Sequence, residues 1–346
     1  MTKRVLITGV AGFVGSHLAE ALLSRGWEVI GLDNLSQGSL DNLASALQRP
    51  EFSFTQGDVR DERLVSELAT RVSVIAHLAA YKIPRYGGRL DTLDINGRGM
   101  MSVLEAARRV GCKVVFTSTS DVYGKNPTLP FGEDASDLVM GSPQVRRWAY
   151  AVSKMYSEHL CLGYGEAHKV PVAIVRYFGS YGPRQHLDWW GGPQALFIKA
   201  AMAGEEIEVH GDGLQTRCFS YVDDTVRGTA LAVERDEAIG EIINIGSTEE
   251  ITIKGLAELT WRLVGRTELP RVRLVPYSQF GGRYEDVRRR VPDVSKAKRL
   301  LGFESTVGLE DGTRRTIAWI RSLPTRDVAS VGSDPARGLT PSGGMG

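Results

Sequence analysis

Tyr150 and Lys154 lie four residues apart in the segment Tyr150-Ala-Val-Ser-Lys154. On a helix this spacing puts both side chains on one face, where they can act as a single acid–base unit. Free tyrosine is a poor base at neutral pH, but a neighbouring ammonium favours the phenolate and lowers the pKa of the tyrosine. Such a tyrosine can take the proton of a substrate hydroxyl. The same spacing also fits an exposed helix with one aromatic anchor, so its meaning depends on the rest of the sequence.

A glycine-rich turn near the N-terminus predicts a dinucleotide site. It follows the strand-like run 5–7, opens a helical pattern and reads Gly9-Val10-Ala11-Gly12-Phe13-Val14-Gly15. Glycines permit a tight turn there and let backbone N–H groups approach a pyrophosphate at the helix N-terminus. Asp33 ends the second strand-like run, where a carboxylate suits a ribose diol and repels a 2′-phosphate. The pattern therefore favours NAD over NADP.

The elements that must position these residues follow a regular alternation. From residue 4 to residue 180, short β-branched runs alternate with helical patterns, and the runs are Val5-Leu6-Ile7, Val29–Leu32, Val74–Leu78, Val114–Thr117 and Val172–Val175. This rhythm predicts an α/β fold, a Rossmann-type doubly wound parallel sheet with helices on both faces. We expect an NAD-binding domain over 1–180. A smaller C-terminal α/β substrate lobe over 181–322, partly re-entrant into the first, and a disordered tail over 323–346 would follow.

Composition excludes several classes of protein. The 346 residues carry a formal net charge of +1, with 42% hydrophobic and 24% charged residues, as in ordinary globular proteins. Near-neutral charge argues against a nucleic-acid surface. Cys112, Cys161 and Cys218 are few, odd in number and widely spaced, which fits neither a disulfide framework nor a zinc site. The cysteine spacing thus gives no reason to expect a metal. No apolar segment has the length of a membrane span or signal peptide, so we expect a cytoplasmic protein.

An ordered set of short motifs resembles the extended short-chain dehydrogenases/reductases, and among them the enzymes that act on nucleotide sugars. The set spans residues 3–320 and comprises the glycine turn, Leu32-Asp33-Asn34-Leu35-Ser36, Gly57-Asp58-Val59, His77-Leu78-Ala79-Ala80, Asn96, Ser118-Thr119-Ser120-Asp121-Val122-Tyr123-Gly124, Tyr150-x-x-x-Lys154 and Gly182-Pro183-Arg184. Each piece is weak alone, but their order is specific. The resemblance implies NAD as cofactor, a nucleotide-sugar substrate and a homodimer through two long helices.

The resemblance also implies roles for particular positions. Tyr150 would take the proton of the sugar 4-hydroxyl while C4 gives hydride to NAD, Lys154 would hold the nicotinamide ribose, and Thr119 would hydrogen-bond the same hydroxyl. Further cofactor contacts would come from Asn34, Asp58, Val59, Leu78, Ala79, Ala80 and Lys82, with Lys82 approaching the phosphates. Substrate contacts would come from Arg85, Gly179, Arg184, Arg217 and Arg283, with the last two gripping the nucleotide diphosphate. A solvated Lys82 and a strand-end cap at Thr119 are the plainer alternatives.

The residues after Thr119 bear on the chemical step that comes after oxidation. Dehydratases of the family usually carry an Asp-Glu pair there, whereas this chain has Ser120-Asp121 and so lacks the second carboxylate for elimination. UDP-glucuronate decarboxylases resemble this chain in having Ser followed by an acid, although theirs is usually Glu, and in the Arg-x-Pro at Arg290. We therefore expect a UDP-glucuronate decarboxylase in which Asp121 and Arg290 act after oxidation. A capping aspartate and a surface arginine are their alternative roles.

Two departures keep other reactions open. Gly179 stands where most relatives have Asn, and the Trp189-Trp190 insertion has no counterpart that we can assign. A UDP-hexose or UDP-glucuronate 4-epimerase is the main alternative, and a 4,6-dehydratase is a third. A non-catalytic, NAD-sensing regulator on the same fold is the alternative outside enzymes, although such proteins commonly lose the Tyr, Lys or Thr that this chain retains.

Overall fold

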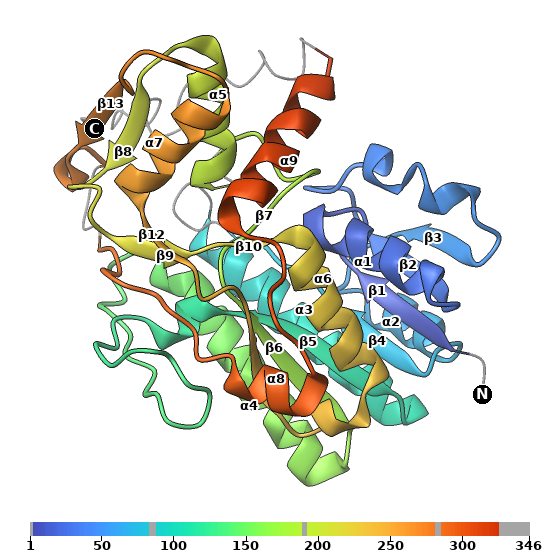
Figure 1. The fold of residues 1–346 in the computed structure, drawn as a ribbon. Helices are drawn as coiled ribbons and strands as arrows, with labels where there is room; N and C mark the ends of the chain where they lie inside the picture. Colours follow the sequence, from blue (N-terminus) through green and yellow to red (C-terminus); the bar gives the residue numbers. More distant parts are fainter. Residues whose placement is uncertain (1–2, 83–87, 189–191, 281–284, 325–346) are drawn as a thin grey trace, which may run out of the picture.

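The structure, a computed structural model, describes residues 3–82, 88–188, 192–280 and 285–324. Its centre is a seven-stranded parallel sheet with strand order β11-β6-β5-β4-β1-β2-β3 (Figure 1). The strands are β1 (Arg4–Thr8), β2 (Glu28–Asp33), β3 (Phe52–Gln56), β4 (Val74–His77), β5 (Lys113–Thr119), β6 (Val172–Tyr177) and β11 (Ile242–Ile245). The five strand-like runs predicted from sequence fall on β1, β2, β4, β5 and β6, with Leu78 one residue past the end of β4, and the predicted doubly wound α/β fold is confirmed. The order reverses between β1 and β4, which is where such folds bind ligands.

Helices cover both faces of the sheet. One face carries α1 (Phe13–Ser24) and α6 (Val222–Glu234), and the other carries α2 (Glu62–Ala69), α3 (Arg89–Val110) and α4 (Trp148–His168). Val5 and Ile7 of β1 pack into the core under α1, whereas Leu6 packs into the core under α3. Because side chains alternate along a strand, burial on both faces requires the continuous apolar run seen in the sequence.

A smaller lobe lies beside the carboxyl ends of the strands, at the upper left of Figure 1. Its paired strands are β8 (Ile207–His210) with β13 (Val272–Val275), β9 (Thr216–Cys218) with β12 (Glu250–Thr252), and β7 (Ser180–Tyr181) with β10 (Ser220–Tyr221). The remaining helices are α5 (Pro193–Ala203), α7 (Ile253–Leu263), α8 (Ser295–Leu301) and α9 (Leu309–Ser322). Short 3-10 helices are η1 (Leu40–Leu43), η2 (Ala46–Gln48), η3 (Ser120–Tyr123), η4 (Asp236–Ala238) and η5 (Tyr277–Phe280).

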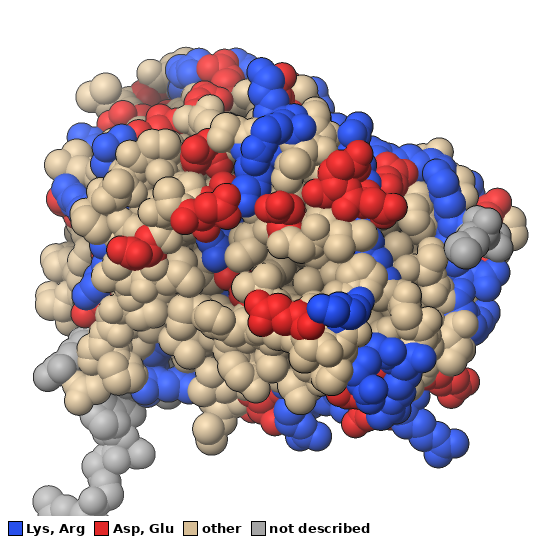
Figure 2. Space-filling view, turned by 90° about the horizontal axis from the view of Figure 1, so that it is seen from below, with Lys and Arg blue, Asp and Glu red and all other residues tan. Residues whose placement is uncertain are grey.

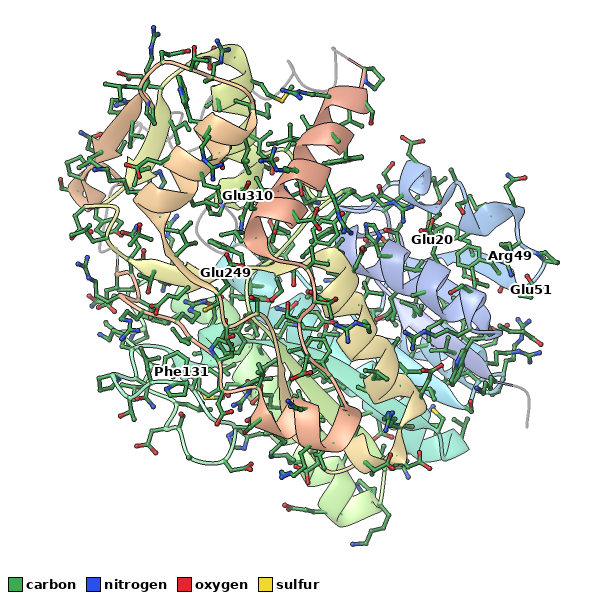
Figure 3. The ribbon with its side chains drawn as sticks, in the orientation of Figure 1. Glu20, Arg49, Glu51, Phe131, Glu249 and Glu310 are labelled. Carbon is green, nitrogen blue, oxygen red and sulfur yellow. The ribbon has the colours of Figure 1, made fainter. Side chains whose placement is uncertain are left out.

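The chain after residue 181 also returns to the first lobe. Strand β11 pairs with β6 in the central sheet, and α6 packs beside α1. Ion pairs fasten the two regions, because Glu20 on α1 (Figure 3) accepts from Arg184 at 2.7 Å and Glu234 at the end of α6 accepts from Arg25 at 2.7 Å. Residues 222–245 therefore belong to the central sheet and its core, whereas the other strands after residue 181 form separate two-stranded sheets.

The surface carries charges of both signs. Figure 2 shows one face, on which acidic and basic side chains are interspersed, as the formal net charge of +1 implies. Within the described ranges, the structure has no helix that is both long and apolar enough to cross a bilayer.

Candidate active site

A cavity of about 420 Å³ lies at the carboxyl ends of the central strands. Residues that follow β1, β2, β4, β5 and β6 line it, together with residues of α4 and of the segment before α5. Parallel strands bring their carboxyl ends to one edge of the sheet, which is why residues distant in sequence meet here.

The glycine turn forms one wall of this cavity. Gly9 has a φ of +74°, and a Cβ there would lie 2.7 Å from the backbone N of Ala79. A Cβ on Gly15 would lie 2.1 Å from the carbonyl oxygen of Gly9, so no larger residue fits. Gly12 caps α1 without a side-chain hydrogen bond, and Phe13 and Val14 line the cavity beside it. The free N–H groups at the start of this helix fit a diphosphate.

Asp33 is fixed at the end of β2. Its two carboxylate oxygens accept hydrogen bonds from the backbone N–H groups of Ala11 at 3.0 Å and Leu35 at 2.8 Å. Burial raises the pKa of Asp33, and these two hydrogen bonds partly oppose that shift. The carboxylate is therefore oriented at the cavity wall before any ligand binds, as the ribose-binding role requires.

The other residues predicted at the adenosine end also line the cavity. Asn34 donates a hydrogen bond to Asp58 at 3.2 Å, and Arg60 forms an ion pair with Asp58 at 2.8 Å. Hydrogen bonds from Arg60 lower the pKa of Asp58. Val59 presents an apolar surface beside them. The Asp58 carboxylate is thus partly committed to Arg60, a partner that sequence reasoning did not anticipate.

Tyr150 and Lys154 both lie on α4 and line the cavity, but their electrostatics differ from the prediction. The Lys154 ammonium donates to the carbonyl oxygen of Thr117 at 2.8 Å and lies 6.0 Å from the centre of the Tyr150 ring. Burial raises the pKa of Tyr150, and the nearby Asp121 and Tyr177 raise it further. The expectation that the pKa of this tyrosine is lowered is wrong for the chain by itself, because burial and the neighbouring Asp121 and Tyr177 raise it instead.

Burial also acts on Lys154, whose side chain is only 2% exposed. It lowers the pKa of Lys154 from 10.5 to about 7, although the Glu158 carboxylate one turn further along α4 favours the charged form. Glu158 itself forms a buried ion pair with Arg176 at 2.7 Å and accepts from the hydroxyl of Ser118. Lys154 can therefore exchange its proton near neutral pH.

Thr119 and Ser120 end β5 next to the acid–base pair. The hydroxyl oxygen of Thr119 accepts from the backbone N–H of Asp121 at 3.2 Å and so caps η3. Its own hydrogen is left to donate, which allows capping and a substrate contact together. The hydroxyl of Ser120 accepts from Arg290 at 3.4 Å.

Asp121 belongs to a charged cluster that joins the two lobes. Arg290 pairs with it at 2.7 Å and Arg147 at 3.6 Å, while Asp286 pairs with both Arg147 and Arg217 at 2.8 Å. Burial raises the pKa of Asp121, but Arg290 and Arg147 outweigh that effect and lower it to about 2. Asp121 is therefore ionised at neutral pH. Arg290 lines the cavity, and its buried Nε has no hydrogen-bond partner within the described residues.

Two members of this cluster, Arg147 and Asp286, were not predicted as site residues. Arg147 immediately precedes the helix of Tyr150, and Asp286 opens the basic run that contains Arg290. A charged residue next to a predicted catalytic element is the only signal that the sequence offers for either. Tyr177, His186 and Gln194 line the cavity as well and were also missed. Tyr177 ends β6, so the rule that strand ends meet at one edge could have found it.

The predicted substrate arginines lie in different places. Arg217 is held by Asp286 and donates to the carbonyl oxygens of Val287 at 2.7 Å and Thr216 at 2.6 Å. Arg184 pairs with Glu20 on α1. Neither is among the residues that line the cavity, and their roles in substrate binding stay predictions.

Four further predictions concern the same region. Gly179 does line the cavity, with a φ of +50° and only 2.7 Å between a hypothetical Cβ and the carbonyl oxygen of Cys218. Arg85, Arg283 and the Trp189-Trp190 insertion fall outside the described residues.

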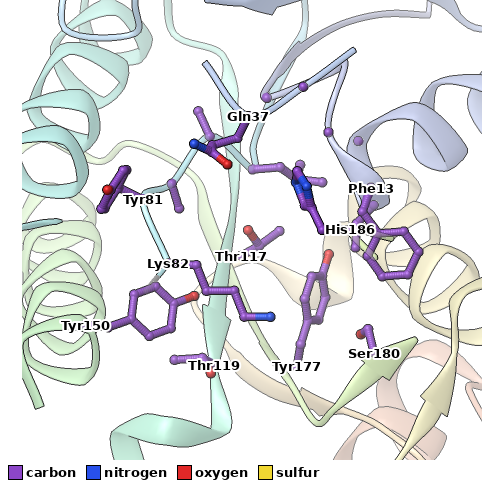
Figure 4. A pocket seen from close by; sticks show the side chains of 18 of the residues that line it. Phe13, Gln37, Tyr81, Lys82, Thr117, Thr119, Tyr150, Tyr177, Ser180 and His186 are labelled. Atoms are coloured by element: carbon purple, nitrogen blue, oxygen red, sulfur yellow. The ribbon is translucent and has the colours of Figure 1, made fainter. Parts of the chain in front are cut away.

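The segment after β4 supplies the last predicted contacts. Leu78, Ala79 and Ala80 line the cavity, as does Lys82. In Figure 4 the side chain of Lys82 extends between Tyr150 and Tyr177 on the side of Thr119, while Phe13 lies beyond Tyr177 and His186. In this view the ammonium points toward Tyr177. The predicted contact of Lys82 with the cofactor phosphates stays a prediction.

Comparisons with known proteins show which family the chain resembles. The sequence profile of the family described as GDP-mannose 4,6 dehydratase matches residues 6–316. The chain is 39% identical to a UDP-N-acetyl-alpha-D-glucosaminuronate decarboxylase of Bacillus cytotoxicus, over 93% of this chain and 99% of that protein. It is 36% identical to UDP-glucuronic acid decarboxylase 1 of Danio rerio, over 92% of this chain and 72% of that protein.

A solved structure shares the architecture as well. The UDP-glucuronic acid 4-epimerase of Bacillus cereus, in complex with UDP-glucuronic acid and NAD, superimposes with a TM-score of 0.82 at 31% identity. The match covers 92% of this chain and 99% of that one. Relatives of this kind are thus named as decarboxylases and as epimerases.

Proposed function

Because this chain belongs to the GDP-mannose 4,6-dehydratase-like family of extended short-chain dehydrogenases/reductases, we propose that it binds NAD and decarboxylates a UDP-linked uronate. The chain is an enzyme of the nucleotide-sugar decarboxylase and epimerase group. UDP-glucuronate is the substrate expected from sequence, and the relative from Bacillus cytotoxicus adds UDP-N-acetylglucosaminuronate as the second candidate.

The residues present fit NAD. The start of α1 would hold its diphosphate, Asp33 its adenosine ribose, and Tyr150 and Lys154 its nicotinamide ribose. When bound, NAD supplies the acceptor for the hydride that leaves C4 of the sugar. All these groups line a single cavity, so cofactor and sugar can meet there.

Oxidation at C4 needs a base for the hydroxyl proton. Tyr150 is placed for this, with Thr119 donating to the same oxygen. Burial keeps Tyr150 a neutral phenol by itself, so proton removal depends on positive charge beside it, and Lys154 and Lys82 are the lysines that line the cavity. The phenol form then suits the next step, in which a donor is required.

The 4-ketone lies β to the C5 carboxylate, which makes loss of carbon dioxide feasible. The C5–C6 bond breaks, its electron pair moves into an enolate, and the negative C4 oxygen is stabilised by Tyr150 and Thr119 as hydrogen-bond donors. C5 then takes a proton from water, because Asp121 has a pKa of about 2 and carries none at neutral pH. The product is the 4-keto pentose, or the pentose after hydride returns to C4.

Arg290 is the observation that favours decarboxylation. Asp121 and Ser120 both contact Nη1 of its guanidinium beside the cavity, and the buried Nε has no hydrogen-bond partner within the described residues. An arginine fixed by a counter-ion suits a carboxylate without adding a full uncompensated charge. Elimination of a 6-hydroxyl, in contrast, would need a proton donor that an ionised Asp121 is not.

The test is product analysis with purified protein and NAD. UDP-glucuronate and UDP-N-acetylglucosaminuronate are each incubated with the protein and NAD. Released carbon dioxide is trapped, and the masses of the products are measured by mass spectrometry. We expect a product lighter by one carbon dioxide from at least one of them, and none with Tyr150→Phe. A product of unchanged mass with inverted C4 would reject decarboxylation and establish the 4-epimerase instead.

We also propose a homodimer that is formed through α3 and α4. These helices pack together and present exposed apolar side chains, including Leu93 and Met101 on α3 and Val152 and Tyr156 on α4. A second copy would bury this apolar face.

A further inference from the structure

Lys82 is a cation in the active-site cavity without a protein partner. It forms no hydrogen bond or ion pair within the part of the chain that the structure describes, whereas Lys154 and Arg290 both have partners. Its charge is felt by Asp121, which attracts it, and by His186, whose pKa it helps to lower after burial. The exposed surface of Lys82 faces the cavity, so an anion that enters the cavity is the natural counter-ion.

The direction of the Lys82 side chain favours the sugar carboxylate over the cofactor phosphates as this anion. The side chain of Lys82 runs between Tyr150 and Tyr177 on the side of Thr119, its ammonium points toward Tyr177, and Phe13 at the start of α1 lies on the far side of Tyr177 (Figure 4). Tyr150 and Thr119 are the groups that would hold the C4 oxygen. On a uronate ring the C4 oxygen and the carboxylate are carried by neighbouring carbons, so a cation beside these hydroxyls also reaches the carboxylate.

Charge balance supports the same choice. Arg290 is compensated by Asp121 at 2.7 Å, so this pair adds little net attraction for an acid. Lys82 is a further basic group of the cavity, and within the described residues no carboxylate contacts it directly. Burial lowers the pKa of Lys82, and a carboxylate ligand would favour its charged form, whereas a neutral hexose ring would not.

We propose that Lys82 binds the carboxylate of the sugar and thereby selects a uronate over a neutral hexose. The inference rests on the proposed function for its substrate class. Because the ion pair forms when substrate binds and is lost when the carboxylate leaves as neutral carbon dioxide, removal of Lys82 should raise KM for the uronate more than it lowers kcat.

The experiment measures binding in a background that cannot turn over. Full-length Tyr150→Phe protein loaded with NAD is titrated with UDP-glucuronate and with UDP-glucose in a calorimeter. Adding Lys82→Met should reduce the uronate-to-hexose affinity ratio about tenfold or more, as expected for one charge-assisted contact. Lys82→Arg should keep most of the ratio. Lys199→Met, on α5 and outside the cavity lining, is the matched control and should leave the ratio within about twofold.

Several results would overturn the proposal. The ratio could be unchanged by Lys82→Met, or the Tyr150→Phe parent could fail to prefer the uronate. A lower NAD affinity with an intact ratio would assign Lys82 to the cofactor phosphates. Release of carbon dioxide by the wild-type protein is scored separately. If none is released although the ratio depends on Lys82, decarboxylation is rejected and uronate recognition by Lys82 stands.

Discussion

Replacing Lys154 by methionine should make the protein more stable in the absence of cofactor while abolishing its activity. Lys154 is 2% exposed, and burial lowers its pKa from 10.5 to about 7. Each pKa unit corresponds to about 1.4 kcal/mol, so holding this ammonium in the folded chain costs about 5 kcal/mol below pH 7. Methionine fills a similar volume without the charge.

The cost depends on pH in a defined direction. Between pH 7 and pH 10.5 the unfolded chain binds the Lys154 proton and the folded chain does not, so the stability of the wild-type protein rises with pH. The cost falls from about 4 kcal/mol at pH 7 to about 2 kcal/mol at pH 9. The variant loses the hydrogen bond to Thr117, about 1 kcal/mol, which leaves a gain of about 3 kcal/mol at pH 7 and about 1 kcal/mol at pH 9.

Urea unfolding of wild type and Lys154→Met at pH 7 and pH 9, on protein freed of NAD, measures the gain in free energy of unfolding at each pH. Lys254→Met removes a lysine whose side chain is 51% exposed on α7 and is the control, for which we expect no pH-dependent change. The reasoning would be refuted if Lys154→Met were no more stable than wild type at pH 7, or if its gain in free energy of unfolding did not shrink at pH 9. Either result would mean that the buried Lys154 charge does not destabilise the folded protein.

Four further outcomes are expected. Gly15→Ala should abolish NAD binding in a fluorescence titration, because the new Cβ would lie 2.1 Å from the Gly9 carbonyl oxygen. Asp33→Ala should lower the affinity for NAD about tenfold and reduce the ratio of NAD affinity to NADP affinity, both measured in the same titration. Asp121→Asn should lower carbon dioxide release about a hundredfold or more, and since its pKa is about 2 the wild-type pH profile should show no titration of this carboxyl above pH 4. Tyr156→Glu, at an exposed position on α4, should convert a dimer to a monomer in sedimentation velocity.

Each of these outcomes has a clear opposite. Undiminished NAD affinity in Gly15→Ala or Asp33→Ala would mean that the cofactor lies elsewhere. Full carbon dioxide release by Asp121→Asn would show that Arg290 needs no counter-ion. A wild-type protein that sediments as a monomer would reject the proposed face on α3 and α4.

Local patterns predicted the sheet and the cofactor turn well. Strands buried on both faces need continuous β-branched runs, and Val5-Leu6-Ile7 is such a run, fully buried in the structure. The glycine turn is equally local, because the contacts that exclude a Cβ at Gly15 come from Gly9, six positions earlier.

The charged cluster illustrates what sequence could not supply. Arg147 and Asp286 are 139 positions apart, and only the packing of the two lobes brings them within 2.8 Å. The counter-ion of Arg217, Asp286, lies 69 positions away and could not be identified from the sequence. The predicted direction of the Tyr150 pKa shift was wrong for a related reason. A spacing of four residues reveals a nearby ammonium but not the burial that raises the pKa.

The return of the chain to the central sheet has a consequence for protein engineering. Grafting residues 181–322 from a relative as one block would also replace α6 and β11, so residues of another protein would have to pair with β6 and cover α1. A poorly paired sheet edge invites pairing with other chains. Chimeras that exchange substrate preference must therefore transplant two separate segments, before α6 and after β11, and keep residues 222–245 from the recipient. The segments that determine substrate specificity in this architecture are not contiguous in sequence, so they cannot be exchanged as one block.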